Sequence, residues 1–237
     1  INNIKPIEQR LNTLASCFKN YDLEGLYIVP ALRKYINDNC IVRGQYMKGK
    51  VPGTNYTWCF YLRRGLYNPE FNKHLAVCFL YKIKKEVGHF DFQLSGLETA
   101  ATPMVTSLPI YAKQLLDIDL HSFIFRKAPK EYGLEEPWEG TPKFDTPTLL
   151  VDDLANSTMS LKICSDICRN YEIQKLNYAF VIVNKVNRSY YDMGLPEEQY
   201  SKSEHELRQK HDMYLDPNTT IISLFDMDEF NLKGASH

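Results

Sequence analysis

Continuous apolar runs alternate with segments of helical spacing over the second half of the chain. Three runs are apolar throughout and end in polar residues, which is typical of strands covered on both faces; they are residues 148–151, 178–183 and 220–225. Helical spacing occupies 158–169 and 98–115, although Pro103 and Pro109 should each break or kink the second of these helices. Strands that alternate with helices predict an α/β fold with a mostly parallel central sheet flanked by helices.

Weaker patterns surround these runs. Two helices are expected in the first forty residues, because apolar positions recur at helical spacing around 7–15 and again around 27–36. We also expect a strand at 55–63, a helix opened by Pro69, a strand at 90–94 that runs into a turn, and a short strand at 121–125. Residues 186–217 are strongly polar and indicate an insertion or an exposed helix. Because no repeat, linker or shift in composition divides the chain, we expect one domain over 1–237.

Composition and charge exclude several classes of protein. The chain has 237 residues and 44% hydrophobic content, which is enough to bury a full core. Its 28 Lys and Arg residues against 29 Asp and Glu residues argue against nucleic acid as the main partner. No apolar run approaches the roughly 20 residues that cross a bilayer, and the first six residues lack the apolar core of a signal peptide. We therefore expect a cytoplasmic protein with no membrane partner, and its six scattered cysteines to be reduced thiols.

The strand at 148–151 carries the strongest candidate chemistry. We expect it to end at Asp152 and Asp153, which are followed by a small polar loop and the start of a helix. Ligands of open α/β sheets bind at the carboxyl ends of the strands. There, two adjacent acids can accept hydrogen bonds from vicinal hydroxyls, while amides and hydroxyls at a helix start can hold a phosphate. The alternative is an acidic first helical turn that the helix dipole stabilises.

These residues resemble the signature of the type I phosphoribosyltransferases, which is an apolar strand, two acids, an apolar residue and a Thr/Gly-rich loop. The segment from Arg126 to Gly133 resembles the Arg-Lys-x-x-Lys-x-His-Gly loop of the orotate branch at the same spacing, and Glu139-Gly140 resembles the Glu-Gly that follows it. Leu94 to Ala101 looks like the pyrophosphate loop of the family. More loosely, Arg43 to Gly49 resembles its N-terminal hood segment, and Val183 to Lys185 falls where the family has Asp-Arg.

The resemblance implies transfer of phosphoribosyl from phosphoribosyl pyrophosphate to a nucleobase, with orotate as the first candidate. Pyrophosphate is released, Mg²⁺ arrives bound to the substrate, and no metal ligands are predicted in the protein. The resemblance also implies a homodimer, a small hood region within 1–65 and an α/β core over 66–237 that carries the polar insertion.

Roles follow from the resemblance residue by residue. Asp152 and Asp153 would hold the ribose hydroxyls. The 5-phosphate loop would be Asn156, Ser157, Thr158, Met159 and Ser160. The pyrophosphate would meet Ser95, Gly96, Arg126, Lys127, Lys130 and Tyr132. The catalytic candidates are Lys127, Lys130 and the two aspartates, which would also complement positive charge on the ribose ring. Lys48 and Lys185 would face the base.

Three departures from the family pattern keep alternatives open. Thr158 stands where the family has Gly, and a β-branched residue adds bulk where a phosphate must approach backbone amides. Tyr132 replaces the loop His, and Lys185 replaces an Arg and so lacks its bidentate fork. One alternative is a catalytically inactive protein of this fold that binds phosphoribosyl pyrophosphate or a nucleotide as a sensor or regulator; another is a transferase for a different base.

Overall fold

The computed structural model describes residues 28–48, 55–128, 136–156, 158–185, 215, 218–230 and 232. The helices are α2 (Ile28–Tyr35), the π-helical turn η1 (Ile36–Cys40), α3 (Arg63–Leu66), α4 (Pro69–Glu86), α5 (Thr102–Leu116), α6 (Met159–Asn170) and the 3₁₀ turn η3 (Met227–Glu229). The strands are β1 (Ile41–Lys48), β2 (Asn55–Phe60), β3 (Gln93–Ser95), β4 (His121–Ser122), β5 (Ile124–Phe125), β6 (Trp138–Glu139), β7 (Thr148–Ala155), β8 (Lys175–Asn184) and β9 (Thr220–Asp226).

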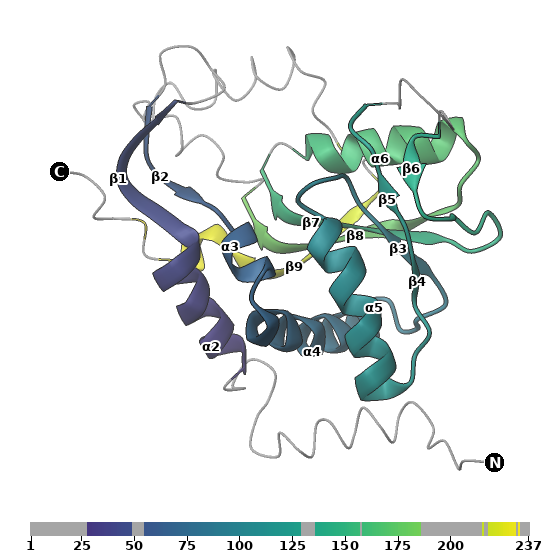
Figure 1. The fold of residues 1–237 in the computed structure, drawn as a ribbon, viewed down its shortest axis with the longest axis horizontal. Coiled ribbons are helices and arrows are strands. Elements are labelled where there is room, and N and C mark those ends of the chain that lie inside the picture. Colours follow the sequence, from purple (N-terminus) through teal and green to yellow (C-terminus); the bar gives the residue numbers. More distant parts are fainter. Residues whose placement is uncertain are drawn as a thin grey trace.

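A five-stranded parallel sheet forms the centre of the fold. Its strand order is β4-β3-β7-β8-β9, and every neighbouring pair is parallel. Helices α4 and α5 lie on one face of this sheet and α6 lies on the other (Figure 1). The predicted α/β fold with a mostly parallel central sheet flanked by helices is therefore confirmed.

Burial on both faces explains why the central strands are apolar throughout. In β7, Leu149 and Val151 belong to the cluster that packs with α4 and α5, whereas Leu150 belongs to the cluster that packs with α6. In β8, Phe180 meets Phe79 of α4 edge to face, with ring centroids 4.9 Å apart. Each strand thus needs apolar side chains at odd and even positions alike.

Helix α4 begins where the sequence predicts. Pro69 stands in its first turn, where an amide hydrogen has no helical partner, and the Asn68 side chain accepts a hydrogen bond from the Phe71 amide at 3.1 Å. At the other end, the Lys84 ammonium donates to the Gly88 carbonyl at 2.9 Å. The first of these contacts pairs an amide that the helix itself leaves unpaired, and the second ties the chain after α4 to its last turn.

Neither proline breaks the helix predicted at 98–115. Pro103 lies in the first turn of α5, where its missing N–H costs no hydrogen bond, and Pro109 lies inside the same continuous helix. Leu108 and Ala112, on either side of Pro109, are fully buried. Their packing stabilises the helix against the loss of one backbone hydrogen bond.

The apolar block 121–125 is two strands rather than the single strand predicted. β4 pairs with β3 in the central sheet, whereas β5 pairs antiparallel with β6 in a separate ribbon. The chain between them remains bound to the loop after β3, because the Phe123 amide donates to the Leu94 carbonyl and the Phe125 amide donates to the Gly96 carbonyl. Residues 121–125 therefore pair first with β3 and then with β6, and they stay beside β3 throughout.

The N-terminal part of the described chain forms a hairpin beside the main sheet. Strands β1 and β2 pair antiparallel, and Figure 1 shows the hairpin and α3 beyond the ends toward which the central strands point. The predicted second N-terminal helix corresponds to α2, while the helix predicted around 7–15 lies outside the described residues. Of the polar segment 186–217, only Leu215 is described, so the insertion and the hood boundary at 65 remain predictions.

No helix in the described part of the chain is long and apolar enough to cross a membrane.

Gly96 makes a close backbone contact between the central strands. A Cβ atom at this position would lie 2.3 Å from the Val151 carbonyl oxygen and 2.4 Å from the Ala101 Cβ. We expect Gly96→Ala to reduce the free energy of unfolding by about 1–3 kcal/mol, because backbone and a short side chain cannot move aside.

Urea denaturation checks this expectation, with Gly65→Ala as the matched control. There the added methyl would meet only the Phe71 ring, at 3.0 Å, and a ring can shift. Equal losses in the two variants would contradict the steric explanation.

Candidate active site

The two acids lie inside β7 rather than after it, which corrects the predicted end of that strand. Beyond Val151 the strand continues because Asp152 pairs with Val181 and Ala155 pairs with Asn184 in β8. Pairing with β8, which continues to Asn184, thus extends β7 through the polar residues. The acids are consequently held by the ladder of the sheet near its carboxyl edge.

Asp152 is buried, Asp153 is half-buried, and the two residues are hydrogen-bonded to each other. The Asp152 side chain is almost fully buried, and one of its carboxylate oxygens accepts a hydrogen bond from the Asp153 amide at 2.9 Å. The Ser160 hydroxyl, in the first turn of α6, also hydrogen-bonds to the Asp152 carboxylate. Sheet and helix together therefore fix the orientation of this carboxyl group.

Burial raises the pKa of both carboxyl groups. Loss of solvation is the main reason that the pKa of Asp152 lies well above its usual range, and repulsion by the Asp153 carboxylate adds to it. Burial likewise raises the pKa of Asp153, against opposing effects of its hydrogen bond to Asp152 and of the positive charge of Arg63. The pair thus favours a singly protonated state.

The loop after β7 turns sharply at the position where the family has glycine. Thr158 has φ 54° and ψ 10°, the left-handed region that a β-branched residue adopts at a cost. Its side chain is buried, and its hydroxyl oxygen accepts a hydrogen bond from the Leu215 amide at 3.3 Å. Asn156 is exposed before this turn, Met159 begins α6 after it, and Ser157 lies outside the described residues.

The turn from β3 into α5 contains a buried hydroxyl. Ser95 is fully buried at the carboxyl end of β3, and its Oγ has no hydrogen-bond partner in the described structure. The loop continues through Glu98, whose peptide bond to Thr99 is cis, and reaches the first turn of α5 at Thr102. The amides of that turn point a positive partial charge toward the same edge of the sheet.

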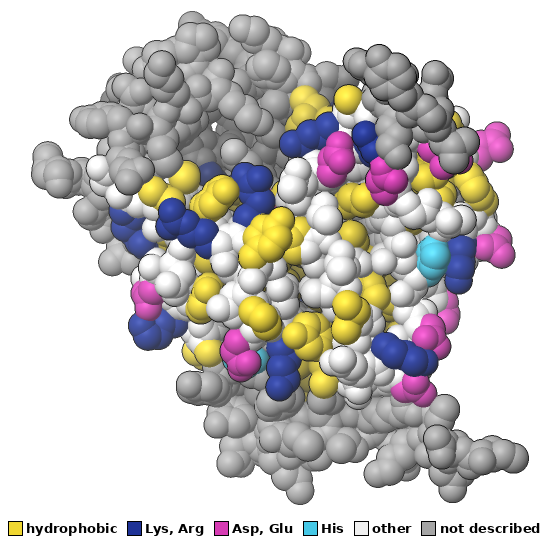
Figure 2. Space-filling view, viewed as in Figure 1, with side chains coloured by type: hydrophobic (Ala, Val, Ile, Leu, Met, Phe, Trp, Pro, Cys, Tyr) yellow, Lys and Arg dark blue, Asp and Glu magenta, His cyan; other side chains and the backbone are white. Residues whose placement is uncertain are grey.

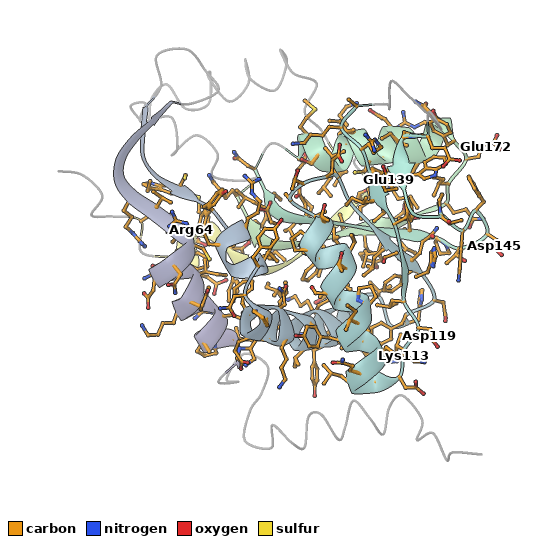
Figure 3. All side chains as sticks on the ribbon, in the orientation of Figure 1. Arg64, Lys113, Asp119, Glu139, Asp145 and Glu172 are labelled. Carbon is orange, nitrogen blue, oxygen red and sulfur yellow. The ribbon has the colours of Figure 1, made fainter. Side chains whose placement is uncertain are left out.

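The predicted loop cations begin directly after β5. Arg126 forms an ion pair with Glu139 of β6, which Figure 3 labels, and its amide donates to the Pro137 carbonyl at 2.8 Å. The Lys127 side chain is exposed. Lys130 and Tyr132 lie outside the described residues.

The predicted base side of the site joins the hairpin to the end of β8. The Lys185 side chain is buried, and its ammonium lies 5.1 Å from the centroid of the Trp58 ring in β2. The Lys185 amide donates to the Ala155 carbonyl at 2.7 Å, which links this lysine to the strand of the acid pair. Lys48 pairs with Asn55 through the backbone of the hairpin, and its side chain lies outside what the structure describes.

Sequence reasoning missed two residues on this side, Trp58 and Arg63. Both fall in the segment predicted as a strand, where an aromatic and a basic side chain carry no motif. The Arg63 guanidinium stacks over the Tyr61 ring at 4.9 Å while its charge acts on Asp153. Figure 2 shows several Lys and Arg side chains gathered around the end of the molecule where the hairpin lies.

The two thiols of α6 face the core. Cys164 and Cys168 are buried, and burial raises the pKa of both, to about 12 for Cys168. Within the described residues, no group of three or more His, Cys, Asp or Glu side chains is arranged to hold a metal ion. The burial of both thiols agrees with the packing role that the sequence predicts.

Comparison with solved structures identifies the class to which the fold belongs. The chain has the fold of the type I phosphoribosyltransferases. It is similar to the orotate phosphoribosyltransferase of Mycobacterium tuberculosis, with a TM-score of 0.61 at 13% identity over 86% of this chain and 99% of that one. The structure of the same enzyme in complex with phosphoribosyl pyrophosphate has a TM-score of 0.55 at 11% identity, over 85% and 90% of the two chains.

Comparison with curated sequences points to the same branch. The chain is 28% identical to the orotate phosphoribosyltransferase of Methanocaldococcus jannaschii over 148 residues, which are 62% of this chain and 76% of the relative. No protein-family model matches the chain. The resemblance inferred from the motifs is therefore confirmed.

The buried acid pair makes stability depend on pH. In the folded protein the pair retains a proton that the unfolded carboxyl groups, with pKa values near 4, have already released. The free energy of unfolding should therefore fall as pH rises from about 4 to the raised pKa of the folded pair. We expect Asp152→Asn to flatten this fall.

Urea denaturation at several pH values in that window measures the slope. Asp119→Asn is the control, because its carboxyl group is 83% exposed at the far end of α5, beside Lys113 (Figure 3). An unchanged slope in Asp152→Asn would show that the pair does not retain the proton.

The left-handed turn at Thr158 also has a measurable consequence. Thr158→Gly and Thr158→Ala both remove the hydroxyl that meets Leu215, but only alanine keeps a Cβ atom in the left-handed region. We expect the glycine variant to be the more stable of the two by about 1 kcal/mol.

The same pair of substitutions at Lys73, exposed within α4, should give the opposite order, because glycine weakens an ordinary helix position. Thermal denaturation of the four variants decides the question. A more stable alanine variant at position 158 would contradict the left-handed backbone conformation of Thr158.

Proposed function

We propose that this protein transfers a phosphoribosyl group from phosphoribosyl pyrophosphate to an anionic nucleobase, with orotate as the first candidate and pyrophosphate as the second product. The observation that carries the proposal is the pair of buried Asp152 and half-buried Asp153, held by β7 at the carboxyl edge of a parallel sheet beside the start of α6. That arrangement suits a phosphorylated sugar, whose hydroxyls need acceptors and whose phosphate needs amides.

The acid pair has two tasks in this proposal. Its carboxylate oxygens accept hydrogen bonds from the ribose hydroxyls, and its negative charge stabilises the positive charge that develops on the ribose ring as the C1–O bond to pyrophosphate breaks. Burial disfavours the doubly ionised state, so the two acids share a proton in the free site. Hydrogen bonds donated to the carboxylates favour their ionised form, so substrate binding should release this proton. The base nitrogen then forms the new bond to C1, while the departing oxygen retains the electron pair of the broken bond.

The pyrophosphate would occupy the side of the sheet edge next to β3. Within the described part of the chain the buried hydroxyl of Ser95 has no partner, which is unusual for a buried polar group, and a ligand oxygen at that position would satisfy it. Arg126 and Lys127 would add positive charge, and Lys130 and Tyr132 would complete the loop as the resemblance implies. Fixed cations and amides stabilise the leaving group without needing to reorganise.

Mg²⁺ fits this arrangement as a companion of the substrate. The described residues provide a pair of carboxyl groups but no cluster of three ligating side chains, and Mg²⁺ commonly binds through one or two carboxylates together with substrate phosphates. Asp152 and Asp153 are the residues that would meet it. When bound, the ion neutralises charge on the pyrophosphate.

The base would lie between the hairpin and the end of β8. The buried ammonium of Lys185 provides a positive charge for an anionic base such as orotate, and the Trp58 ring beside it provides an aromatic surface. Lys48, whose strand forms the other half of the hairpin, would add a second cation. A lysine in place of arginine gives a single point of attachment, so a transferase for another base remains the first alternative.

A second function is favoured by one observation. Thr158 already fills the turn where a 5-phosphate would bind, and its hydroxyl is hydrogen-bonded to Leu215. A protein that binds phosphoribosyl pyrophosphate or a nucleotide without turnover, as a sensor or regulator, would show this loss. The cations at Arg126 and Lys127 favour the enzyme, because binding alone does not require groups that stabilise a leaving group.

Release of pyrophosphate from phosphoribosyl pyrophosphate with Mg²⁺ and orotate, uracil, adenine or no base tests the proposal. We expect turnover with orotate, a loss of at least about 100-fold in Asp152→Asn/Asp153→Asn, and a KM for orotate raised about 10-fold or more in Lys185→Ala but much less in Lys185→Arg. Asp119→Asn should retain full activity.

Each other outcome has a distinct meaning. Turnover only with another base would show that the protein is a phosphoribosyltransferase whose acceptor is not orotate. No turnover together with calorimetric binding of phosphoribosyl pyrophosphate would establish the sensor. Sedimentation of the full chain tests the homodimer that the resemblance implies.

A further inference from the structure

The loop after β3 and the chain after β5 run side by side. Leu97 and Phe125 form a parallel bridge, the Phe125 amide donates to the Gly96 carbonyl, and the Glu98 amide donates to the Phe125 carbonyl, both at 2.9 Å. Two segments that the proposed function gives to one pyrophosphate are thus joined by backbone hydrogen bonds.

The side chain of Glu98 adds a further contact between the two segments, at Lys127. The Glu98 carboxylate accepts a hydrogen bond from the Lys127 amide at 2.9 Å, across 29 residues of sequence. A carboxylate that accepts an amide hydrogen forms one of the stronger hydrogen bonds in proteins. Lys127 therefore has its backbone fixed by a charged group of the neighbouring loop.

The charge of Glu98 makes this contact unexpected. A carboxylate in a loop that receives pyrophosphate repels the ligand, so ligand binding by itself disfavours an acid here. The acid does not neutralise the lysine either, since within the described residues no carboxylate lies within ion-pairing distance of the Lys127 ammonium. Arg126, by contrast, has its guanidinium paired with Glu139. Glu98 thus holds the backbone of Lys127 and leaves its ammonium available to a ligand.

We propose that Glu98 is a positioning residue for the pyrophosphate site: through the Lys127 amide it holds the Lys127 ammonium where it meets the pyrophosphate group. This inference rests on the proposed function, because it takes the pyrophosphate site from it. Glu98 itself touches neither the ligand nor the reacting atoms. Its contribution is to hold in advance a flexible side chain that would otherwise lose conformational freedom on binding.

Titration calorimetry with magnesium pyrophosphate on the full chain tests the inference. Glu98→Gln removes the negative charge but keeps an oxygen that can accept the Lys127 amide, whereas Glu98→Ala removes both. We expect Glu98→Gln to bind pyrophosphate at least as tightly as the unmodified chain and Glu98→Ala to bind about 10-fold more weakly. A Glu98→Ala variant that binds as tightly as Glu98→Gln would overturn the proposal, since only the charge would then matter.

A double-variant cycle identifies the residue through which Glu98 acts. Lys127→Ala keeps the amide but removes the ammonium, so in that background Glu98→Ala should cause no further loss of pyrophosphate affinity. A 10-fold loss that persists there would mean that Glu98 acts elsewhere. Glu86→Ala, which removes a carboxylate 4.0 Å from Lys82 at the end of α4, is the control and should bind normally.

Two further readouts separate this inference from the proposed function. Amide hydrogen exchange should show Lys127 protected in the unmodified chain and in Glu98→Gln but not in Glu98→Ala, and an unprotected Lys127 amide in the unmodified chain would overturn the contact. The transferase assay should show Glu98→Ala lowering kcat/KM for phosphoribosyl pyrophosphate with KM for the base unchanged. If Glu98→Ala has no effect in the Lys127→Ala background but the chain never turns over, the enzyme proposal is refuted and the positioning role stands. If the chain turns over but the effects of Glu98→Ala and Lys127→Ala on pyrophosphate affinity simply add, the enzyme proposal stands and the positioning role is refuted.

Discussion

The parallel pairing of β7 with β8 is the constraint on which the rest of the site depends. It carries β7 four residues past the apolar run, so that two carboxyl groups are held by a rigid ladder instead of a loop. Rigid placement is what allows the acids to be buried next to each other, since a mobile chain would separate two like charges. The raised pKa of Asp152 is therefore a direct result of strand pairing.

The same pairing brings the other parts of the site together. Lys185 follows the last residue of β8, and its amide bonds to Ala155, the last residue of β7. On the opposite side of β7, strand β3 delivers Ser95 in register with Leu150, two residues before the first acid. The residues to which the proposed function assigns a base, a sugar and a pyrophosphate thus occur in this spatial order along one sheet edge, because three neighbouring strands end there.

Much of this arrangement could be predicted from the sequence, and the failures have physical causes. The buried strands and their parallel pairing were predictable because burial on both faces demands runs such as 178–183, and Pro69 marks a helix start by its own chemistry. The extension of β7 through its two acids was not predictable, because it comes from pairing with β8 and leaves no apolar pattern in the sequence. Trp58 and Glu98 were missed because their contacts, with Lys185 and the Lys127 amide, are tertiary and leave no local pattern.

The hydrogen bond between the Thr158 hydroxyl and the Leu215 amide has a consequence for the order in which the protein is made. These residues are 57 positions apart, and β9, which completes the sheet beyond β8, begins only after Leu215. On the ribosome, the turn that opens α6 is therefore synthesised well before the partner that fixes it. Until Leu215 has left the exit tunnel, a threonine in left-handed geometry lacks its hydrogen bond, so the turn before α6 should reach its final geometry late in translation, after β7, which carries both acids, has been synthesised.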